Sequence, residues 1–459
     1  TVIPPLLEGS PTSIIGPISI ILIAGLVALG VLGLLIDKVW CKDKPFILRS
    51  SRTRLWARFM VWTSYMYLVP GLFAVLFSFN LRVKLPSGTI LGVDPGGGIG
   101  PGKPITETMV GLVETLWTTG GQMVAVLVVF YAMAIPALKI ILLSIGTYAG
   151  DEPSSTSRRC FWIVQNISKW ACPDLFAYIL LMQLIEDLGG ISPYVVTASQ
   201  MDLGYTCFSL FCIGSSIASL GYRVPDREHA LFQRIAVLLG GKEKVVYYVA
   251  VLTVVFFGLF IGGIVNPAMG VELGELNATM QAALESLGLT GKIKAHIGIG
   301  HCTKELVEDV LRGHVTSIIS FNMLLVFVII MPALDMILLL MSAVRLKAGS
   351  ASANGGMTMA RAWICKKLAM LDVAIMGIVV VSLAMTMYRQ YLVVKLHRGL
   401  WLSLIAEGVH YFTYYLVKAT FELELPELEL GDPKSDDECS DTSVEECSGE
   451  DEELNRQVH

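Results

Sequence analysis

Nine long apolar stretches constrain this chain more than any other feature of its sequence. Each of them reaches or approaches the roughly 20 residues that a helix needs to cross the hydrocarbon core of a bilayer. Their predicted limits are 13–36, 57–79, 119–146, 170–187, 203–221, 245–265, 316–343, 368–388 and 400–418. Hydrophobic residues make up 54% of the chain and charged residues only 16%, which excludes an ordinary soluble domain. The sequence therefore predicts an all-helical, multi-pass integral membrane protein.

Basic residues in the loops predict how these spans are oriented. Lysine and arginine concentrate in four loops that nine spans would place on one side of the membrane, at 37–58, 149–169, 222–244 and 345–367. By the positive-inside rule this side is the cytoplasm. The amino terminus is then expected outside and the carboxyl terminus in the cytoplasm. The same topology puts Asn277 in an outer loop and Asn166 in the cytoplasm.

Residues 421–459 form a strongly acidic tail. They hold 15 Asp and Glu against 2 Lys and Arg, within a chain whose formal net charge is −5. Such dense like charge without an apolar period predicts a disordered segment. The tail either only keeps the protein soluble or binds a cytoplasmic protein.

The chain repeats itself at an offset of about 196 to 198 residues, which indicates an internal duplication. The string AIPALKIILL of the third predicted span corresponds to IMPALDMILL of the seventh. This alignment pairs Pro136 with Pro332, and it pairs Lys139 with Asp335. The equivalent positions in the two copies would therefore carry complementary charges.

A second pair of strings, KWACPDLF and KLAMLDVA, extends the repeat and aligns Asp174 with Asp372. Each copy holds four spans, an even number, so the copies are expected to run parallel and to share any site between them. The predicted organisation is an extra amino-terminal span, two tandem four-span modules and the acidic tail, at 1–55, 56–222, 223–420 and 421–459.

Several motifs, taken in order, resemble the paraquat-inducible protein A family, which includes the bacterial lipophilic-envelope-spanning-tunnel A proteins. They are YLVPGLF (67–73), GLVETLW (111–117), IPALK (135–139), the KWxxxDxF pattern (169–176), MPALD (331–335) and KLAMLDV (367–373). The resemblance covers roughly residues 56–420. It implies a membrane protein that moves lipids between membranes, with membrane lipids and a mammalian-cell-entry domain protein or another lipid-transfer protein as partners. The chain departs from the bacterial pattern because it lacks paired CxxC zinc ribbons, gains a span and ends in the acidic tail.

Charged residues inside the predicted spans are candidates for a lipid or substrate site. Lys139 would either line a cavity and meet a lipid phosphate or an internal carboxylate, or snorkel to the inner interface. Asp335 would be its counterpart in the second copy. Asp174 and Asp372 begin spans, where a carboxylate in the first helical turn is favoured by the helix dipole and caps free amides. The sequence favours this capping role over a direct role in the lipid or substrate site.

Two further features of the spans join this candidate site. Pro136 and Pro332 each remove a backbone hydrogen bond within a long helix and bend it, which either widens a lipid path or only serves packing. Glu407 and His410 lie three residues apart on one helical face, so they form either a satisfied buried pair or a proton-linked site.

The motifs of common enzymes and metal sites are absent from the sequence. It contains no Walker loop, no HExxH, no GxSxG and no metal-ligand spacing of Cys and His. We therefore expect no enzyme activity, no cofactor, no metal and no nucleic-acid partner. The predicted function is lipid transfer or membrane lipid homeostasis, with lipid entering a groove between the proline-bearing spans. The alternatives are a secondary transporter of a small amphipathic solute and a scaffold that acts through its acidic tail.

Overall fold

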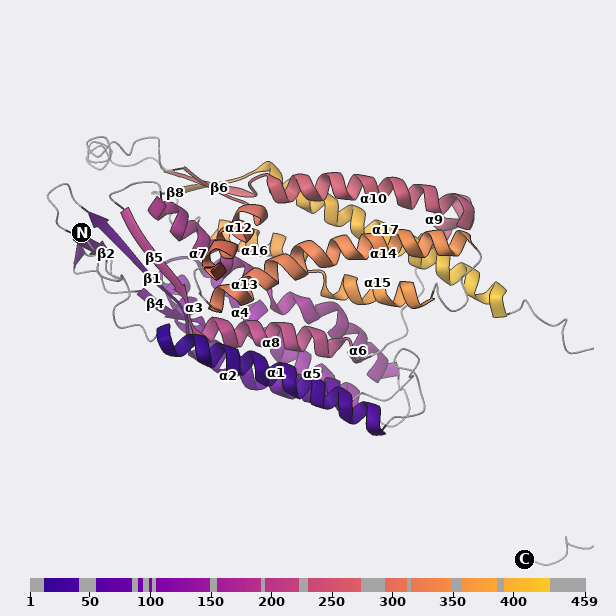
Figure 1. Ribbon diagram of the computed structural model, residues 1–459, viewed down its shortest axis with the longest axis horizontal. Helices are drawn as coiled ribbons and strands as arrows, with labels where there is room; N and C mark the ends of the chain where they lie inside the picture. The colour runs from indigo at the N-terminus through magenta and orange to yellow at the C-terminus, as the bar shows by residue number, and fades with distance from the viewer. Residues whose placement is uncertain are drawn as a thin grey trace, which may run out of the picture.

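The computed structural model describes most of the chain as a bundle of long helices with two small antiparallel sheets at one end (Figure 1). The described residues are 12–40, 55–84, 90–93, 99–100, 105–148, 155–190, 195–222, 230–273, 294–311, 315–348, 356–385 and 392–429. The acidic tail from residue 430 onward and Asn277 lie outside these ranges.

The chain begins with a single long helix, α1 (Thr12–Trp40), and continues into a first half of alternating helices and strands. The elements of this first half are α2 (Leu55–Phe73), β1 (Val75–Lys84), β2 (Ile90–Val93), β3 (Ile99–Gly100), β4 (Ile105–Thr108), α3 (Met109–Thr118), α4 (Gln122–Val129), the π-helix η1 (Phe130–Ala134), α5 (Ile135–Tyr148), α6 (Ser155–Ile167), the 3-10 helix η2 (Ser168–Ala171), α7 (Pro173–Gly190), β5 (Val195–Met201) and α8 (Leu203–Ser219).

The second half begins with a short helix, α9 (Ala230–Leu238). Its remaining elements are α10 (Gly241–Val265), β6 (Met269–Leu273), β7 (Lys294–Ile297), α12 (Ile299–Leu311), α13 (Val315–Asn322), the π-helix η3 (Met323–Ile330), α14 (Met331–Lys347), α15 (Gly356–Leu368), α16 (Leu371–Met385), β8 (Leu392–Leu396) and α17 (Arg398–Glu429). Within the described residues, the order of elements from α10 to α17 follows the order from α2 to α8, except that β2, β3 and η2 have no counterpart.

The two sheets are built by equivalent pairings. In the first, β1 pairs antiparallel with β4 and β5, and β2 and β3 extend the sheet beyond β1. In the second, β6 lies between β7 and β8 and is antiparallel to both. Each sheet therefore joins the ends of helices that are far apart in the chain, and both sheets lie at the same end of the bundle (Figure 1).

The sheets correct the prediction of a purely helical fold, and they shorten one predicted span. The apolar stretch 57–79 is helical only to Phe73, and strand β1 starts at Val75. The reason is visible in the sequence FSFNLRVK (77–84), which alternates apolar and polar residues with the period of a strand. Ladder hydrogen bonds to β4 and β5 then replace the helical ones.

Five helical stretches are long and apolar enough to cross a membrane, at Ile15–Val39, Gln122–Thr147, Glu243–Val265, Thr316–Lys347 and Gly356–Met385. The prediction of an integral membrane protein is thereby confirmed, with a fold that is mainly and not entirely helical. Four other predicted spans correspond to α2, α7, α8 and α17, which do not meet the same criteria of length and apolarity. The count of nine spans and their orientation stay predictions.

Close helix contacts depend on glycine at two places. A Cβ on Gly71 of α2 would lie 3.0 Å from the Phe208 Cα of α8, and a Cβ on Gly263 of α10 would lie 3.0 Å from the Ser403 backbone nitrogen of α17. Small residues allow this approach of helix backbones, as is common where helices pack within membranes. One continuous cluster of buried apolar side chains runs through both halves.

Candidate functional site

A buried lysine connects three elements of the first half. Lys139 on α5 is 0% exposed, and its Nζ donates hydrogen bonds to Ser168 Oγ of η2 at 2.5 Å and to the Ser215 carbonyl oxygen of α8 at 2.7 Å. The interpretation that Lys139 snorkels to an interface is therefore wrong, because the side chain is enclosed. Its two hydrogen-bond partners are uncharged groups, so the ammonium serves here as a donor that ties helices together.

The second half contains a buried trio of two carboxylates and an imidazole. His410 of α17 directs Nε2 toward Asp335 Oδ2 of α14 at 2.7 Å and Nδ1 toward Glu407 Oε2 at 3.2 Å. Asp335 and His410 are 0% exposed and Glu407 is 5% exposed. The predicted pairing of Glu407 with His410 on one helical face is present, and the structure adds Asp335 to it.

Lys169 of the first half reaches Asp372 of the second. The Lys169 Nζ lies 2.6 Å from Asp372 Oδ2, and it also donates to the Tyr411 hydroxyl of α17 at 2.9 Å. The Tyr411 hydroxyl in turn donates to Asp372 Oδ2 at 3.1 Å. Asp372 Oδ1 accepts the amide of Val373 at 2.9 Å, so this carboxylate both contacts the first helical turn and holds a lysine.

A third lysine, Lys366 of α15, lies against three tyrosine rings of α17. Its Nζ is 3.5 Å from the ring centroid of Tyr414, 4.0 Å from that of Tyr415 and 4.3 Å from that of Tyr411. Among the described residues no hydrogen-bond acceptor contacts this buried ammonium. The tyrosine faces stabilise it by cation–π attraction, which is strongest where water is excluded.

Asp174 occupies the position in α7 that Asp372 occupies in α16, but its surroundings differ. It lies in the first turn of α7 and is 1% exposed. Within the described part of the chain, neither of its carboxylate oxygens has a hydrogen-bond partner. The expected capping contact is therefore absent from the described residues. An unpartnered buried carboxyl is costly in its charged form, and such groups tend to hold a proton instead.

Both predicted proline positions coincide with an irregular helix. The π-helix η1 ends immediately before Ile135 and Pro136, and the π-helix η3 ends immediately before Met331 and Pro332. A proline lacks the amide hydrogen of a regular helix, and a wider turn relieves the clash of its ring with the preceding turn. The Pro136 carbonyl oxygen accepts a hydrogen bond from the Tyr65 hydroxyl of α2 at 2.7 Å.

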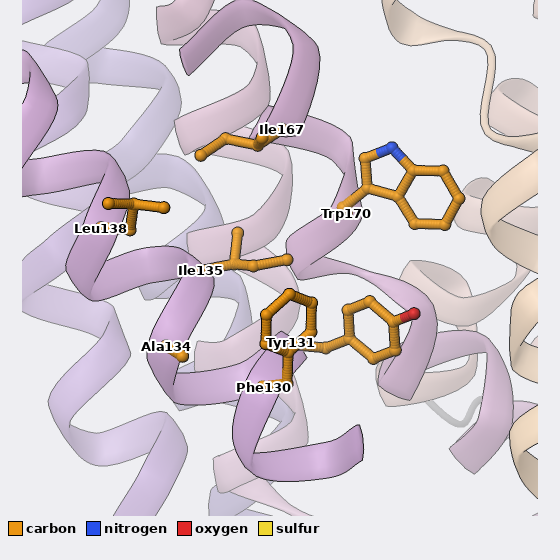
Figure 2. A pocket seen from close by; sticks show the side chains of 7 residues that line it. All are labelled: Phe130, Tyr131, Ala134, Ile135, Leu138, Ile167 and Trp170. Atoms are coloured by element: carbon orange, nitrogen blue, oxygen red, sulfur yellow. The ribbon is translucent and has the colours of Figure 1, made fainter. Parts of the chain in front are cut away.

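An apolar groove lies beside Pro136. It has a volume of about 370 Å³ and is lined by Phe130, Tyr131, Ala134, Ile135, Leu138, Ile167 and Trp170. Figure 2 shows these side chains converging from two walls, one formed by η1 and α5 and the other by the end of α6 with η2. The rings of Tyr131 and Trp170 stack at 6.4 Å between centroids. Lys139 and Pro332 do not line this groove.

The sequence predicted only some of the polar residues that surround Lys139 and the Asp335–His410–Glu407 trio. Ser168, Ser215, Lys366 and the tyrosines of α17 were missed. Tyr411, Tyr414 and Tyr415 share a helical face with Glu407, and this spacing was a readable signal. Among the described residues no group of His, Cys, Asp and Glu side chains, the Asp335–His410–Glu407 trio included, is arranged to hold a metal ion.

Comparison with known proteins tests the resemblance found in the sequence. The model of the family described as paraquat-inducible protein A matches residues 101–221. This part of the chain is similar to the paraquat-inducible protein A family. The matched segment contains Pro136, Lys139, Asp174 and the groove, so the paraquat-inducible protein A resemblance is confirmed where these residues lie. No curated protein and no solved structure matches the chain.

Proposed function

We propose that this protein handles membrane lipids, and that the groove beside Pro136 holds an acyl chain. The observation that carries this proposal is an apolar groove on a helical stretch long enough to span a membrane. Phe130 is 51% exposed and Leu138 is 45% exposed, so the mouth of the groove opens on the lateral surface that faces lipid. Its volume of about 370 Å³ falls within the usual size of small-molecule sites.

Lys139 has a positioning role in this proposal. Ile135 and Leu138 of the groove lie on α5 with Lys139, whereas Ile167 and Trp170 flank its partner Ser168 in the chain. The hydrogen bond from Lys139 to Ser168 therefore joins the two walls of the groove from behind. The lysine acts through the spacing of the walls and not through direct contact with a head group.

We also propose that the halves are tandem copies of one four-span module, with the boundaries predicted from the sequence. The repeated order of elements, the equivalent strand pairings and the π-helix before each proline all support a duplication. Contacts at Gly71 and Gly263 support it as well, because each brings the first long helix of a half against its last helix.

The parallel orientation of these copies would place both sheets on the outer face of the membrane. There they could contact the lipid-transfer partner that the family resemblance implies, such as a mammalian-cell-entry domain protein. In Figure 1, α6 and α15 both lie in the part of the bundle away from the two sheets.

A bulky side chain in the groove tests the lipid proposal. Ala134 lines the groove, whereas Ala137 is exposed on the same helical stretch and does not line it. In liposomes, Ala134→Trp should slow transfer of a fluorescent phospholipid by roughly tenfold, the loss of about 1.4 kcal/mol of tail binding. It should also reduce the lipid that co-purifies with the protein, as measured by mass spectrometry.

Ala137→Trp is the matched control and should keep both quantities near those of the unmodified protein. Equal effects of the two tryptophans, or normal transfer by Ala134→Trp, would show that the groove does not carry lipid.

A further inference from the structure

The contacts of His410 require one proton more than a neutral imidazole and two ionised carboxylates carry. A neutral imidazole has one N–H donor and one lone pair, whereas both ring nitrogens of His410 face carboxylate oxygens. If Asp335 and Glu407 are both ionised, only an imidazolium supplies a donor to each. If the imidazole is neutral, one of the two carboxyl groups must carry the proton. In either case the trio holds one proton more than a neutral imidazole with two carboxylates.

The charged residues around Asp335, His410 and Glu407 are consistent with one extra proton on this trio. Lys366 of α15 faces Asp335 and Glu407, and Cys365 of the same helix faces Asp335. From η2, α16 and α17, Lys169, Asp372 and Tyr411 form a network of their own in which the two charges cancel.

From α10, the ring of Phe256 covers His410 with 5.7 Å between centroids. With both carboxyl groups ionised and the lysine protonated, Asp335, Glu407 and Lys366 together carry one negative charge. The extra proton of the trio balances it. A buried cluster of zero net charge is far less costly than one with an unbalanced charge.

We propose that Asp335, His410 and Glu407 form a proton-binding site whose loading and unloading drives lipid movement. On unloading, an N–H bond of His410, or the O–H bond of the protonated carboxyl, breaks and the proton passes to a water molecule. The Nε2 lone pair of His410 would then face the Asp335 carboxylate, and their repulsion would separate α14 from α17. The coupling to lipid rests on the proposed function, whereas the proton site rests on these contacts alone.

Lys366 is placed to replace the departing proton. Its Nζ and the Asp335 Oδ1 atom both lack a hydrogen-bond partner among the described residues. They carry opposite charges on adjacent helices, α15 and α14. When the proton leaves, the ammonium can exchange the tyrosine faces for the Asp335 carboxylate, which gives this carboxylate a cationic partner in place of the imidazolium and shifts α15. Lys366 thus lies against the tyrosine rings when the trio is protonated and against Asp335 when the proton has left.

The proton site can be tested without any transport assay. The full chain, labelled with ¹⁵N-histidine and reconstituted in liposomes at pH 7.5, should show one imidazolium by solid-state NMR, and His410→Gln should remove this signal. Alternatively, infrared spectra should show a protonated carboxyl band that disappears in Asp335→Asn or Glu407→Gln. A neutral His410 without a protonated carboxyl would overturn the proposal.

A second experiment tests the coupling. Liposomes that carry the unmodified protein should transfer a fluorescent phospholipid several times faster under a pH gradient, and a protonophore should abolish the increase. Asp335→Asn and Glu407→Gln should lose this stimulation, while Glu308→Gln, a surface carboxylate of α12, should retain it. Transfer that ignores the gradient would overturn the coupling. If the unmodified protein transferred no lipid at all, the lipid function would fail while the NMR result still decided the proton site.

Discussion

Lys169 of η2 and Asp372 of α16 form an ion pair that joins the two halves of the chain, with 2.6 Å between Nζ and Oδ2. Both side chains are nearly enclosed, at 12% and 15% exposure. The Tyr411 hydroxyl completes the network by accepting from the lysine and donating to the aspartate. Because its members come from η2, α16 and α17, this network fixes how the helices of the two halves meet.

Breaking this ion pair should destabilise the protein. Asp372→Asn leaves the buried Lys169 ammonium without its counter-charge, a change that typically costs about 3 kcal/mol or more. Thermal unfolding in detergent should show a clear fall in melting temperature. Lys304→Ala serves as the control, because Lys304 is 72% exposed and its contacts with Glu305 and Glu308 lie at the surface. A similar effect of both substitutions would mean that the pair contributes no more than a surface contact.

The glycines at the helix contacts should tolerate no side chain. Gly263→Val would press a branched side chain against the Ser403 backbone, and Gly71→Val would do the same against Phe208. Each should lower the melting temperature and the yield of folded protein, since overpacking typically costs about 1–3 kcal/mol. Gly258→Val is the matched control on α10, because no atom lies within 4 Å of a Cβ placed there. Normal stability of Gly263→Val would show that α10 and α17 pack less closely than described.

Substitution of Lys139 separates a positioning role from a purely structural one. Lys139→Met keeps a similar volume and removes a buried ammonium, so the melting temperature should stay the same or rise. Without the hydrogen bond to Ser168 the walls of the groove are no longer joined, and phospholipid transfer should fall about fivefold, or about 1 kcal/mol. Lys139→Arg should lower the melting temperature, because the larger guanidinium does not fit an enclosed site. A normal transfer rate in Lys139→Met would remove this residue from the function.

Glycosylation can establish the orientation of the spans. In a secretory host, Asn277 of the sequence N-A-T should be modified, because the predicted topology places it outside. Asn166 of N-I-S should stay unmodified; it lies in α6, where its Oδ1 accepts a hydrogen bond from Lys367 Nζ at 3.2 Å. Each site can be assigned by Asn→Gln substitution and a mobility shift. Sugar on Asn166 would reverse the proposed orientation.

Asp202 should make stability depend on pH. It lies between β5 and α8, where burial raises its pKa although the hydrogen bond from Ser78 lowers it. The folded state thus favours the protonated form. This contribution is complete below the unfolded pKa of about 3.9 and is lost as the pH rises through the folded pKa.

Asp202→Asn removes this titration while keeping an acceptor for Ser78. The two proteins should melt at similar temperatures near pH 4, and the variant should melt higher at pH 7.5. If the melting temperature of the variant relative to the unmodified protein fell between pH 4 and pH 7.5, the raised pKa of Asp202 would be contradicted.

The helical part of the fold was largely predictable because long apolar runs have few alternatives. The strands were less so: β1 begins inside a run that is apolar enough to be a span, and short apolar runs do not separate a strand from a helix by composition. Its alternation from Phe77 onward was the readable signal. The partners β4 and β5 were not predictable, because pairing depends on segments far away in the chain.

The candidate site shows the same division between local and distant information. Glu407 and His410 could be paired from the sequence because residues three apart share one face of a helix. The third member, Asp335, comes from another helix, and no local pattern indicates that it meets His410. Lys139 was expected to contact a charged or interfacial group. Its true partners are a serine hydroxyl and a backbone carbonyl, which nothing in the sequence distinguishes from many others.

The strand pairing has a consequence for the integrity of each half. Because β6 is hydrogen-bonded to both β7 and β8, the ends of α10, α12 and α17 next to this sheet are held together independently of the chain that links them. A protease cut between β6 and β7 would therefore leave both fragments attached. The protein could also be divided between β6 and β7 and expressed as two polypeptides that reassemble. A fluorescent reporter inserted at the same position should leave the helix contacts intact.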